Sequence, residues 1–268
     1  MCLAIVRFAP GEAEPLVLGF NRDEDPARDA GSPEVFTWGG RRVLAAREPI
    51  HGGTWLGLND AGLVVGLLNR KVPASSPRCG TPALGCARAR SRGRLRHRVR
   101  SRGLLVLDCL RQGTVRAVQK GLGALAEPYE PFNLFALHAR SAIAVHYEGG
   151  EAQVLPLSPG VHVFAHRDVD DLDEPKVAGA HAACRREAAG QPTDWVATFT
   201  ACLCVHADDP TSEASPCRHG AGYRTLCSTI LAIEGWRPLR GRLLHARGPP
   251  CRTPYRDLTP LIGELHPG

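Results

Sequence analysis

The sequence contains no long apolar run. Apolar runs such as 16–19, 63–68 and 104–107 are short, and none approaches the roughly 18 to 20 residues that span a bilayer. The N-terminal residues also lack a basic segment followed by a long apolar stretch, because the charged segment 21–25 follows almost at once. We therefore expect neither a transmembrane segment nor a secretory signal.

The sequence also lacks a GxGxxG or P-loop pattern, so it does not predict the common loops that hold phosphate groups. Ten cysteines are present, a modest fraction of 268 residues, and no secretory signal accompanies them. Disulfides form mainly in secreted proteins, so we expect reduced thiols, most of them acting as small apolar core residues.

Positive charge is concentrated in one short stretch. The formal net charge is +6, yet arginine occupies every second position from 88 to 102, which gives eight positive charges and leaves the rest of the chain at −2 (+6 minus 8). The arginines have no interleaved aromatic residues and no basic support elsewhere, so we predict no nucleic-acid partner.

The stretch around these arginines differs in composition from the rest of the chain. Residues 73–100 are mainly Pro, Ser, Gly, Ala and Arg, and such a segment cannot bury enough apolar surface to offset its ordering entropy. We predict a disordered, Arg-rich insertion at about 73–100 within a single domain that spans residues 1–268.

Hydrophobic periodicity predicts a sheet-rich α+β protein. The turn-rich segment 9–12 joins two apolar strands into an N-terminal hairpin, and segment 59–62 joins two more. Helical spacing occurs at 104–112 and 177–187. Strands that cluster, with helices between the clusters, favour largely antiparallel sheets. The predicted strands are 3–8, 16–20, 54–58, 63–68, 133–137, 142–147, 161–165 and 229–233.

Cys2 directly follows the initiator methionine on a predicted strand. Removal of Met1 would leave a thiol and a free α-amine on one residue. An α-amine has a pKa of about 8, so it is partly neutral at physiological pH and accepts a proton from the thiol. Cys2 is therefore a candidate nucleophile that carries its own base.

A polar cluster closes the second predicted strand. In an antiparallel hairpin the end of the second strand lies beside the start of the first, so Asn21, Arg22 and Asp23 are expected near Cys2. We predict that Asp23 accepts a hydrogen bond from the α-amine, that Arg22 holds a carboxylate or a substrate acid, and that Asn21 braces the turn.

Asn69 ends the second predicted hairpin. An asparagine amide at a strand end donates a hydrogen bond to an oxyanion that develops during acyl transfer. We predict that Asn69 has this role, and that the two glycines of "HGGTW" allow close backbone approach near the site.

Residues 202–219 contain five potential metal ligands: Cys202, Cys204, His206, Cys217 and His219. Zinc-binding pairs usually leave two to four residues between cysteines, and Cys-x-Cys with Cys-x-His is tighter than that. From this spacing we predict neither a metal nor another cofactor.

Several segments together resemble one known family. "MCLAIVRF", "LVLGFNRDEDPAR", "GGTWLGLNDAGLVVGLLNR", "SRGLLVLDCL", "PFNLFAL", "SPGVHVFAH" and "GYRTLCSTILAI" occur in the order typical of the NRDE, or transport and Golgi organisation, family. The resemblance covers nearly the whole chain, is dense over the first 70 residues and is interrupted at 79–100.

That family is similar to the N-terminal nucleophile hydrolases, especially the branch of bile-salt hydrolases and penicillin acylases. The resemblance implies an α+β fold built as a four-layer αββα sandwich. It also implies that Cys2 is the nucleophile, that Asp23 contacts its amine and that Asn69 is the oxyanion donor.

The chain departs from the expected pattern at four positions, one of which is Ala246, where the resemblance implies the glutamate of a Glu-Arg pair. Phe20 stands where the branch has an arginine before its Asn-x-Asp unit, and His166 stands near the position of an asparagine. Leu226 occupies the register of an arginine of the family. These changes leave open whether Arg22 substitutes for the missing arginine and whether the site is catalytic.

Two functions therefore remain open. The first is an N-terminal-cysteine amidohydrolase or thioesterase-like enzyme that acts on an acyl substrate. The second is a non-catalytic protein that binds or carries a lipid, an acyl thioester or haem in the same cleft. Both imply a small-molecule or lipid-like ligand. We expect a cytoplasmic protein; the resemblance leaves mitochondrial association open, and the sequence leaves the oligomeric state open.

Overall fold

The computed structural model describes residues 2–28, 31–72, 99–125, 129–188, 194–236 and 239–266. The insertion predicted at 73–100 lies outside the described residues, apart from Val99 and Arg100. Within the described ranges, no helix is both long and apolar enough to cross a membrane.

The first of two antiparallel sheets has six strands in the order β10-β1-β2-β11-β12-β13. The N-terminal hairpin lies inside this sheet, with β10 on one side and β11 on the other. The strands are β1 (Leu3–Phe8), β2 (Leu16–Glu24), β10 (Gly160–Phe164), β11 (Arg224–Trp236), β12 (Leu239–Ala246) and β13 (Arg256–Asp257).

The second sheet has seven strands in sequence order, β3 to β9. Every pair of neighbours is antiparallel, and all of the connections are short except the one between β6 and β7, which contains two helices. The strands are β3 (Glu34–Trp38), β4 (Arg41–Ala45), β5 (Leu56–Asn59), β6 (Val64–Asn69), β7 (Phe132–His138), β8 (Ser141–Tyr147) and β9 (Gln153–Pro156).

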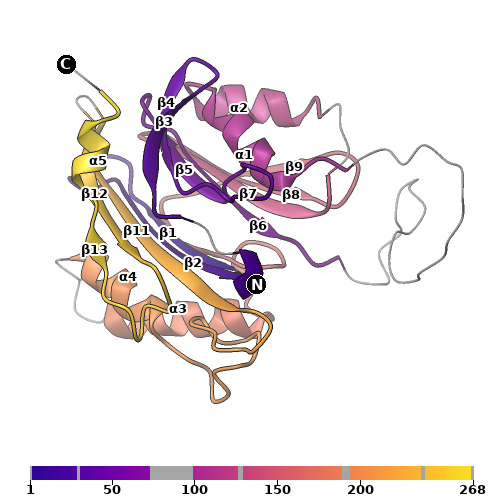
Figure 1. Cartoon of the computed structure of the whole chain (residues 1–268), viewed down its shortest axis with the longest axis vertical. Coiled ribbons are helices and arrows are strands. Elements are labelled where there is room, and N and C mark those ends of the chain that lie inside the picture. The colour runs from indigo at the N-terminus through magenta and orange to yellow at the C-terminus, as the bar shows by residue number, and fades with distance from the viewer. Residues whose placement is uncertain are drawn as a thin grey trace, which may run out of the picture.

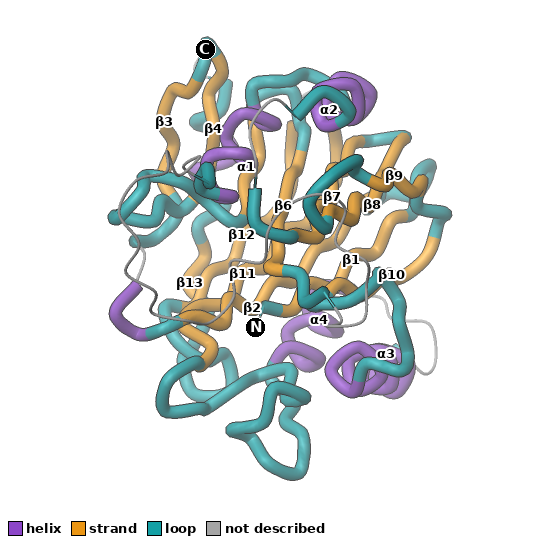
Figure 2. The backbone as a smooth tube through the Cα atoms, turned by 90° about the vertical axis from the view of Figure 1, so that its right-hand side faces the viewer, coloured by secondary structure: helices purple, strands orange, loops and turns teal. Residues whose placement is uncertain are grey.

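Helices cover the outer face of each sheet (Figure 1). The helices α1 (Arg102–Leu110) and α2 (Val115–Leu122) pack on the second sheet, whereas α3 (Pro175–Glu187) and α4 (Trp195–Leu203) pack on the first. Figure 2 shows these pairs on opposite sides of the stacked strands. A 3-10 turn, η1 (Pro26–Arg28), and the short α5 (Pro260–Gly263) complete the described elements. The protein is a four-layer αββα sandwich, as predicted.

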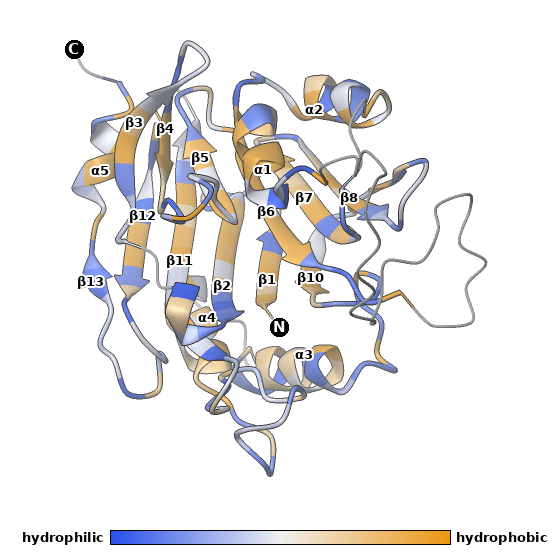
Figure 3. Cartoon of the chain, turned by 45° about the vertical axis from the view of Figure 1, so that its right-hand side comes forward, coloured by the Kyte–Doolittle hydropathy of each residue, from blue (hydrophilic) through white to orange (hydrophobic). Residues whose placement is uncertain are grey.

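Three apolar clusters fill the three interfaces between the four layers. The largest lies between the sheets, the second lies between the second sheet and α1 and α2, and the third lies between the first sheet and α3 and α4. Figure 3 shows the matching apolar colour along the strands. Burial of this apolar surface is the main term that stabilises the layers.

Strand β1 shows why the two sheets are the central layers of the sandwich: each face of the strand packs against another layer. Its alternate side chains face opposite sides of the sheet: Ala4 and Val6 enter the core between the sheets, and Leu3 and Ile5 enter the core under α3 and α4. All six residues of β1 are buried, because both faces are covered.

The structure corrects the predicted end of the second strand and adds strands and helices that the sequence did not predict. Strand β2 continues through Glu24, so the polar cluster at 21–24 lies within a strand and not beyond its end. Strands β3, β4, β9, β12 and β13 and helices α2 and α4 were not predicted. Much of β3 and β9 is only half-buried or exposed, so their sequences show little apolar alternation.

Candidate functional site

The N-terminal hairpin places Cys2 beside the polar end of β2. Leu3 pairs with Asn21 in the ladder between β1 and β2, so Cys2 lies opposite Arg22. The Cys2 thiol donates to the main-chain oxygen of Asp23 over 3.7 Å, and the residue is partly exposed. The hairpin therefore brings together the predicted nucleophile and the predicted acid.

The carboxylate of Asp23 is fully buried and held by two side chains. Lys176 donates to Oδ2 over 2.7 Å, and Thr225 donates to Oδ1 over 2.7 Å. Lys176 comes from the first turn of α3 and Thr225 from β11. Sequence reasoning missed both residues, although a lysine in the first turn of a helix, where the helix dipole disfavours a cation, is an unusual placement.

Arg22 is buried, and its guanidinium lies against an aromatic ring. Its central carbon is 4.3 Å from the ring centroid of Trp55, and Nη1 donates to the main-chain oxygen of Arg28 over 3.0 Å. Stacking on the indole orients the planar cation and weakens its hydration, which suits it to bind an acid.

Asn21 points away from Cys2. Its side-chain amide is buried and donates to the main-chain oxygens of Leu203 and Pro216, over 2.9 and 3.0 Å. Asn21 therefore links the end of helix α4 to the loop at Pro216, and it is not among the residues that line the cavity described below.

Asn69 is the last residue of β6, on the other sheet, and its side chain is exposed. It lies at the mouth of the same cavity as Cys2. The two sheets thus contribute different parts of the candidate site, one the nucleophile and acid and the other the amide.

A cavity of about 340 Å³ joins these residues. Cys2, Arg22, Asp23 and Asn69 line it, which makes four of the five predicted site residues. Trp55 and the first residues of α1 line it as well. The cavity is large enough for a small acyl substrate and carries charges of both signs on its wall.

The glycine pair of "HGGTW" shapes one wall of this cavity. A Cβ atom on Gly53 would lie 2.6 Å from the carbonyl carbon of Gly103, so only glycine allows this approach. The Thr54 amide donates to the Gly103 oxygen over 3.1 Å. This contact fixes the N-terminal end of α1 at the cavity.

The environment of Cys2 keeps its thiol protonated. Burial raises the pKa of the thiol, and the Asp23 carboxylate raises it further, while the Arg22 guanidinium opposes the effect. A base must therefore remove the proton when the sulfur attacks a substrate.

A larger cavity, of about 540 Å³, lies between α1 and α2. Its one nucleophilic side chain among the described lining residues is Cys109, and burial raises the pKa of that thiol to about 12. No predicted site residue lines this cavity. Four of the five predicted site residues line the smaller cavity, which is therefore the candidate site.

The family model of Transport and Golgi organisation 2 matches residues 1–194, more than two thirds of the 268-residue chain. The chain belongs to this family. The matched part includes all five predicted site residues, as well as Lys176. No curated protein matches the chain.

Solved structures of amidases and acylases share the fold of this family member. The Caenorhabditis elegans ortholog of N-acylethanolamine-hydrolyzing acid amidase has 12% identity and a TM-score of 0.57, over 86% of this chain and 92% of that one. The C2A mutant of a conjugated bile acid hydrolase from Clostridium perfringens has 13% identity and a TM-score of 0.52, over 98% and 94%.

Penicillin V acylase from Agrobacterium tumefaciens gives a similar result, with 14% identity and a TM-score of 0.51, over 96% of this chain and 86% of that one. At these identities the likeness establishes the fold alone. The chain has the fold of the N-terminal nucleophile hydrolases, which confirms the predicted fold class.

Three of the four departures from the expected pattern, Phe20, Leu226 and His166, lie near the candidate site or in the sheet that carries it. Phe20 packs in the core between the sheets. Leu226 lies at a bulge between β11 and β2. The continued register of β1 and β10 places His166 beside Cys2, but its ring lies 2.6 Å from a carboxylate oxygen of Glu174 and does not line the cavity.

Proposed function

We propose that this family member is an N-terminal-cysteine amidohydrolase or thioesterase-like enzyme that cleaves an acyl substrate. The observation that carries the proposal is the single cavity lined by Cys2, Arg22, Asp23 and Asn69. These residues supply a thiol, a cation, a carboxylate and an amide, which are the groups that acyl transfer requires.

In the proposed mechanism, the thiol proton of Cys2 passes to the α-amine that removal of Met1 liberates. The sulfur attacks the carbonyl carbon of the substrate, and the Asn69 amide donates to the resulting oxyanion. The C–N or C–S bond to the leaving group then breaks, and the leaving group takes the proton. Water hydrolyses the remaining thioester, which releases the acid and restores the thiol.

Asp23 is a positioning residue in this scheme. Its side-chain oxygens are held by Lys176 and Thr225, so the carboxylate cannot rotate, and its place beside the end of β1 suits it to orient the α-amine of Cys2. Preorganised groups of this kind contribute to catalysis because they need not reorganise during the reaction.

Arg22 is proposed to select the substrate. Its guanidinium lies on Trp55 at the cavity wall, where a carboxylate or another acidic group of a ligand meets both charge and a flat apolar surface. The substrate class that fits is an acyl compound with an acidic group near the scissile bond.

One observation, the ion pair between Asp23 and Lys176, favours a second function, which is ligand binding without catalysis. Asp23 already pairs with Lys176, and this pair reduces the charge available to orient an amine. A non-catalytic protein would use the same cavity to bind a lipid-like acid, an acyl thioester or haem, with Arg22 as the anion contact.

The test is mass spectrometry of the N-terminal peptide before and after incubation with a p-nitrophenyl acyl ester at neutral pH. The enzyme proposal predicts that Met1 is absent and that Cys2 carries the acyl group. Cys2→Ala is expected to abolish both the adduct and p-nitrophenol release. Asn69→Ala is expected to lower the rate by about 10²- to 10³-fold, the usual cost of losing an oxyanion donor.

Cys204→Ala is the matched control, because Cys204 is also partly exposed but does not line the cavity. This variant is expected to behave as the parent does. Retention of Met1 would overturn the enzyme proposal, because the amine of Cys2 would then be an amide. A ligand that binds Cys2→Ala as tightly as the parent, with no adduct on the parent, would favour the binding function.

A further inference from the structure

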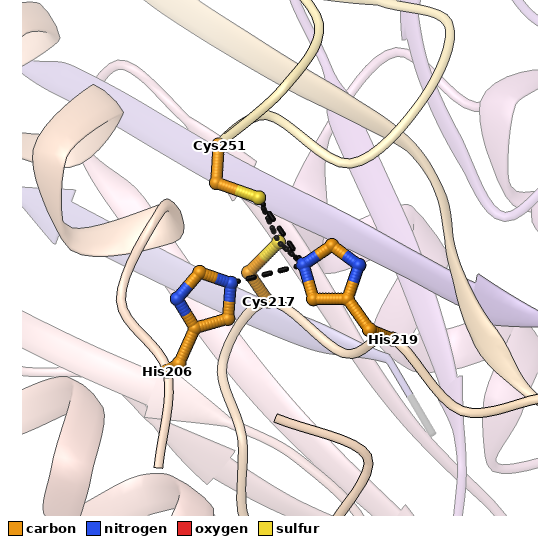
Figure 4. Close-up of side chains that lie close together, drawn as sticks. All are labelled: His206, Cys217, His219 and Cys251. Carbon is orange, nitrogen blue, oxygen red and sulfur yellow. Dashed lines mark hydrogen bonds between the residues drawn. The ribbon is translucent and has the colours of Figure 1, made fainter. Parts of the chain in front are cut away.

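Four metal-ligating side chains from two separate connections, α4–β11 and β12–β13, converge at one point (Figure 4). His206 follows α4, Cys217 and His219 precede β11, and Cys251 follows β12. All four lie beyond residue 194, outside the part of the chain that the family model matches.

The donor atoms have the spacing of a tetrahedral site. Each residue offers one nitrogen or sulfur atom, and these four atoms all lie within 4.8 Å of one another. The sulfurs of Cys217 and Cys251 are 3.6 Å apart, and the Nε2 atoms of His206 and His219 are 3.0 Å apart. The Nε2 atom of His219 lies 3.2 Å from the Cys251 sulfur and 3.9 Å from the Cys217 sulfur.

These separations can be compared with a zinc tetrahedron. Zinc binds sulfur at about 2.3 Å and imidazole nitrogen at about 2.0–2.1 Å, which gives edges of about 3.8 Å between sulfurs, about 3.3 Å between nitrogens and about 3.6 Å between a sulfur and a nitrogen. Each of the four separations given for the cluster is within a few tenths of an ångström of the corresponding edge of the zinc tetrahedron. The two remaining separations, from His206 to the two sulfurs, are at most 4.8 Å, so a movement of His206 by up to about 1 Å completes the tetrahedron around one ion.

The main chain around the cluster is fixed by hydrogen bonds. The Cys217 amide donates to the Val205 oxygen over 2.9 Å, and the His219 amide donates to the Pro210 oxygen over 2.8 Å. The hydroxyl of Ser215 donates to the Cys217 oxygen over 2.7 Å. Cys217 is fully buried, so its sulfur meets the protein interior and the other three donors.

We propose that His206, Cys217, His219 and Cys251 bind one zinc ion. Two thiolates and two neutral imidazoles match the preference of Zn²⁺ for sulfur and nitrogen in tetrahedral geometry. Two thiolates also neutralise the charge of the ion, so the site requires no further acid. Four protein ligands leave no open position, which makes the site structural and not catalytic.

The spacing of the ligands explains why sequence analysis did not predict this site. Cys217 and His219 are separated by one residue, and the fourth ligand, Cys251, lies 32 positions beyond His219. Only the return of the chain through β11 and β12 brings Cys251 back to the loop of Cys217. Cys202 and Cys204, which share the segment, are not members of the cluster.

The zinc loops support the back of the cavity lined by Cys2. Pro216, next to Cys217, accepts a hydrogen bond from Asn21, and the main chain of Arg218 exchanges two hydrogen bonds with Thr225. Thr225 in turn donates to Asp23. The ion therefore joins the loops that hold the polar end of β2, and this role does not depend on the proposed catalytic function.

The experiment measures metal in the full-length protein, purified under reducing conditions and without an affinity resin that carries metal. Inductively coupled plasma mass spectrometry is expected to find one zinc per chain. X-ray absorption at the zinc edge is expected to show two sulfurs at about 2.3 Å and two nitrogens at about 2.0 Å. Cobalt(II) in place of zinc is expected to give tetrahedral d–d bands and thiolate charge-transfer bands.

Variants separate this site from adventitious binding. Cys251→Ser and His206→Ala change partly or fully exposed loop positions, and each is expected to weaken zinc binding at least tenfold while the circular dichroism of the sheets is retained. Cys204→Ser is the matched control, because it removes a neighbouring thiol outside the cluster, and it is expected to retain one zinc. A strong zinc chelator is expected to lower the thermal midpoint of the parent but not that of Cys251→Ser.

Three outcomes would overturn the proposal. The first is the absence of stoichiometric zinc from the parent protein, even after addition of micromolar zinc. The second is undiminished zinc affinity in both Cys251→Ser and His206→Ala. The third is a Cys217–Cys251 disulfide in the protein as isolated, since two oxidised sulfurs cannot act as thiolate ligands.

Discussion

Asp23 and Lys176 form a fully buried ion pair that links β2 to α3. Removing two charges from water is costly, and the pair is tolerated because its partners lie 2.7 Å apart and Thr225 satisfies the second oxygen of Asp23. A single residue therefore carries two roles, since Asp23 lines the cavity and its carboxylate holds the helix.

We predict that Lys176→Met lowers the free energy of unfolding by about 3–5 kcal/mol, because it leaves a buried carboxylate without its cation. Urea unfolding at neutral pH provides the measurement. Adding Asp23→Asn to Lys176→Met is expected to recover part of the loss, because the uncompensated charge is then removed. A loss below about 0.5 kcal/mol in the single variant, the range of an ordinary surface change, would contradict this account.

The connection between β10 and α3 is held by one aspartate. Asp170 has a φ of 60°, a left-handed conformation that aspartate tolerates better than most residues. Its carboxylate lies 2.7 Å from Nδ1 of His162 in β10 and 2.9 Å from Nε2 of His181 in α3, and it accepts from the Val163 amide over 2.7 Å. Helix α3, which carries Lys176, is thus held next to β10 partly by contacts between ionisable side chains.

These contacts change two pKa values in opposite directions. The hydrogen bond to Asp170 raises the pKa of His162, in spite of burial. Burial by itself would raise the pKa of Asp170, but the hydrogen bonds from His162, His181 and the Val163 amide outweigh it and lower that pKa. The raised histidine favours folding at low pH, and the lowered aspartate favours folding at high pH.

We therefore predict that the stability lost in Asp170→Asn, about 1–2 kcal/mol, is greatest between about pH 4 and 6.5. Above this window His162 loses its proton as the pH passes its raised pKa, and below it Asp170 gains one, so the difference from the parent becomes smaller on both sides. The measurement is the free energy of unfolding of the parent and of Asp170→Asn, obtained by thermal or urea denaturation at a series of pH values. Asp173→Asn, an exposed aspartate of the same connection, serves as the control, and an equally pH-dependent loss there would contradict the assignment.

At the scale of the whole molecule, the described residues by themselves form all four layers of the sandwich. The three apolar clusters between the layers contain strand and helix residues from both sides of positions 73–98. Asn69 and Val99, close to the two ends of this segment, line the same cavity. Arg100 belongs to the folded part, since it pairs with Asp108 and donates to the Tyr129 hydroxyl.

We predict that a short Gly/Ser linker in place of residues 75–96 leaves one cooperative thermal transition, as a single domain requires. The midpoint is expected to move by no more than about 4 °C, because shortening a loop changes its closure entropy by only about 1 kcal/mol. Differential scanning calorimetry of parent and variant is the measurement. Loss of the transition would show that the replaced residues belong to the core.

The sequence predicted more of the centre of the fold than of its edges. The strands 3–8 and 142–147 were predicted within one residue of β1 and β8, because their apolar runs and bounding turns are clear. β3 and β9, at the two edges of the second sheet, were missed. An edge strand is only partly buried, so it needs little apolar pattern.

The residues of the candidate site likewise fall into those that the sequence predicted and those that it did not. Cys2, Arg22 and Asp23 were predicted together because a hairpin fixes which residues are neighbours, and four predicted residues line one cavity. Asn21 was predicted to brace the turn, and its amide instead donates to the main chain at Leu203, the end of α4, and at Pro216. Lys176 comes from 153 positions along the chain, so no local pattern indicated it.

Local periodicity and turn chemistry act over a few neighbouring residues, so the amino-acid sequence was enough to predict the N-terminal hairpin and the polar residues at its end. The family was predicted from the resemblance of motifs that occur in a typical order, and the family model confirms it. Which distant side chains meet depends on the fold: Lys176 and Thr225 meet at Asp23, and Cys251 meets His206, Cys217 and His219. Such contacts arise from the packing of layers, and the spacing of residues along the chain does not encode them locally.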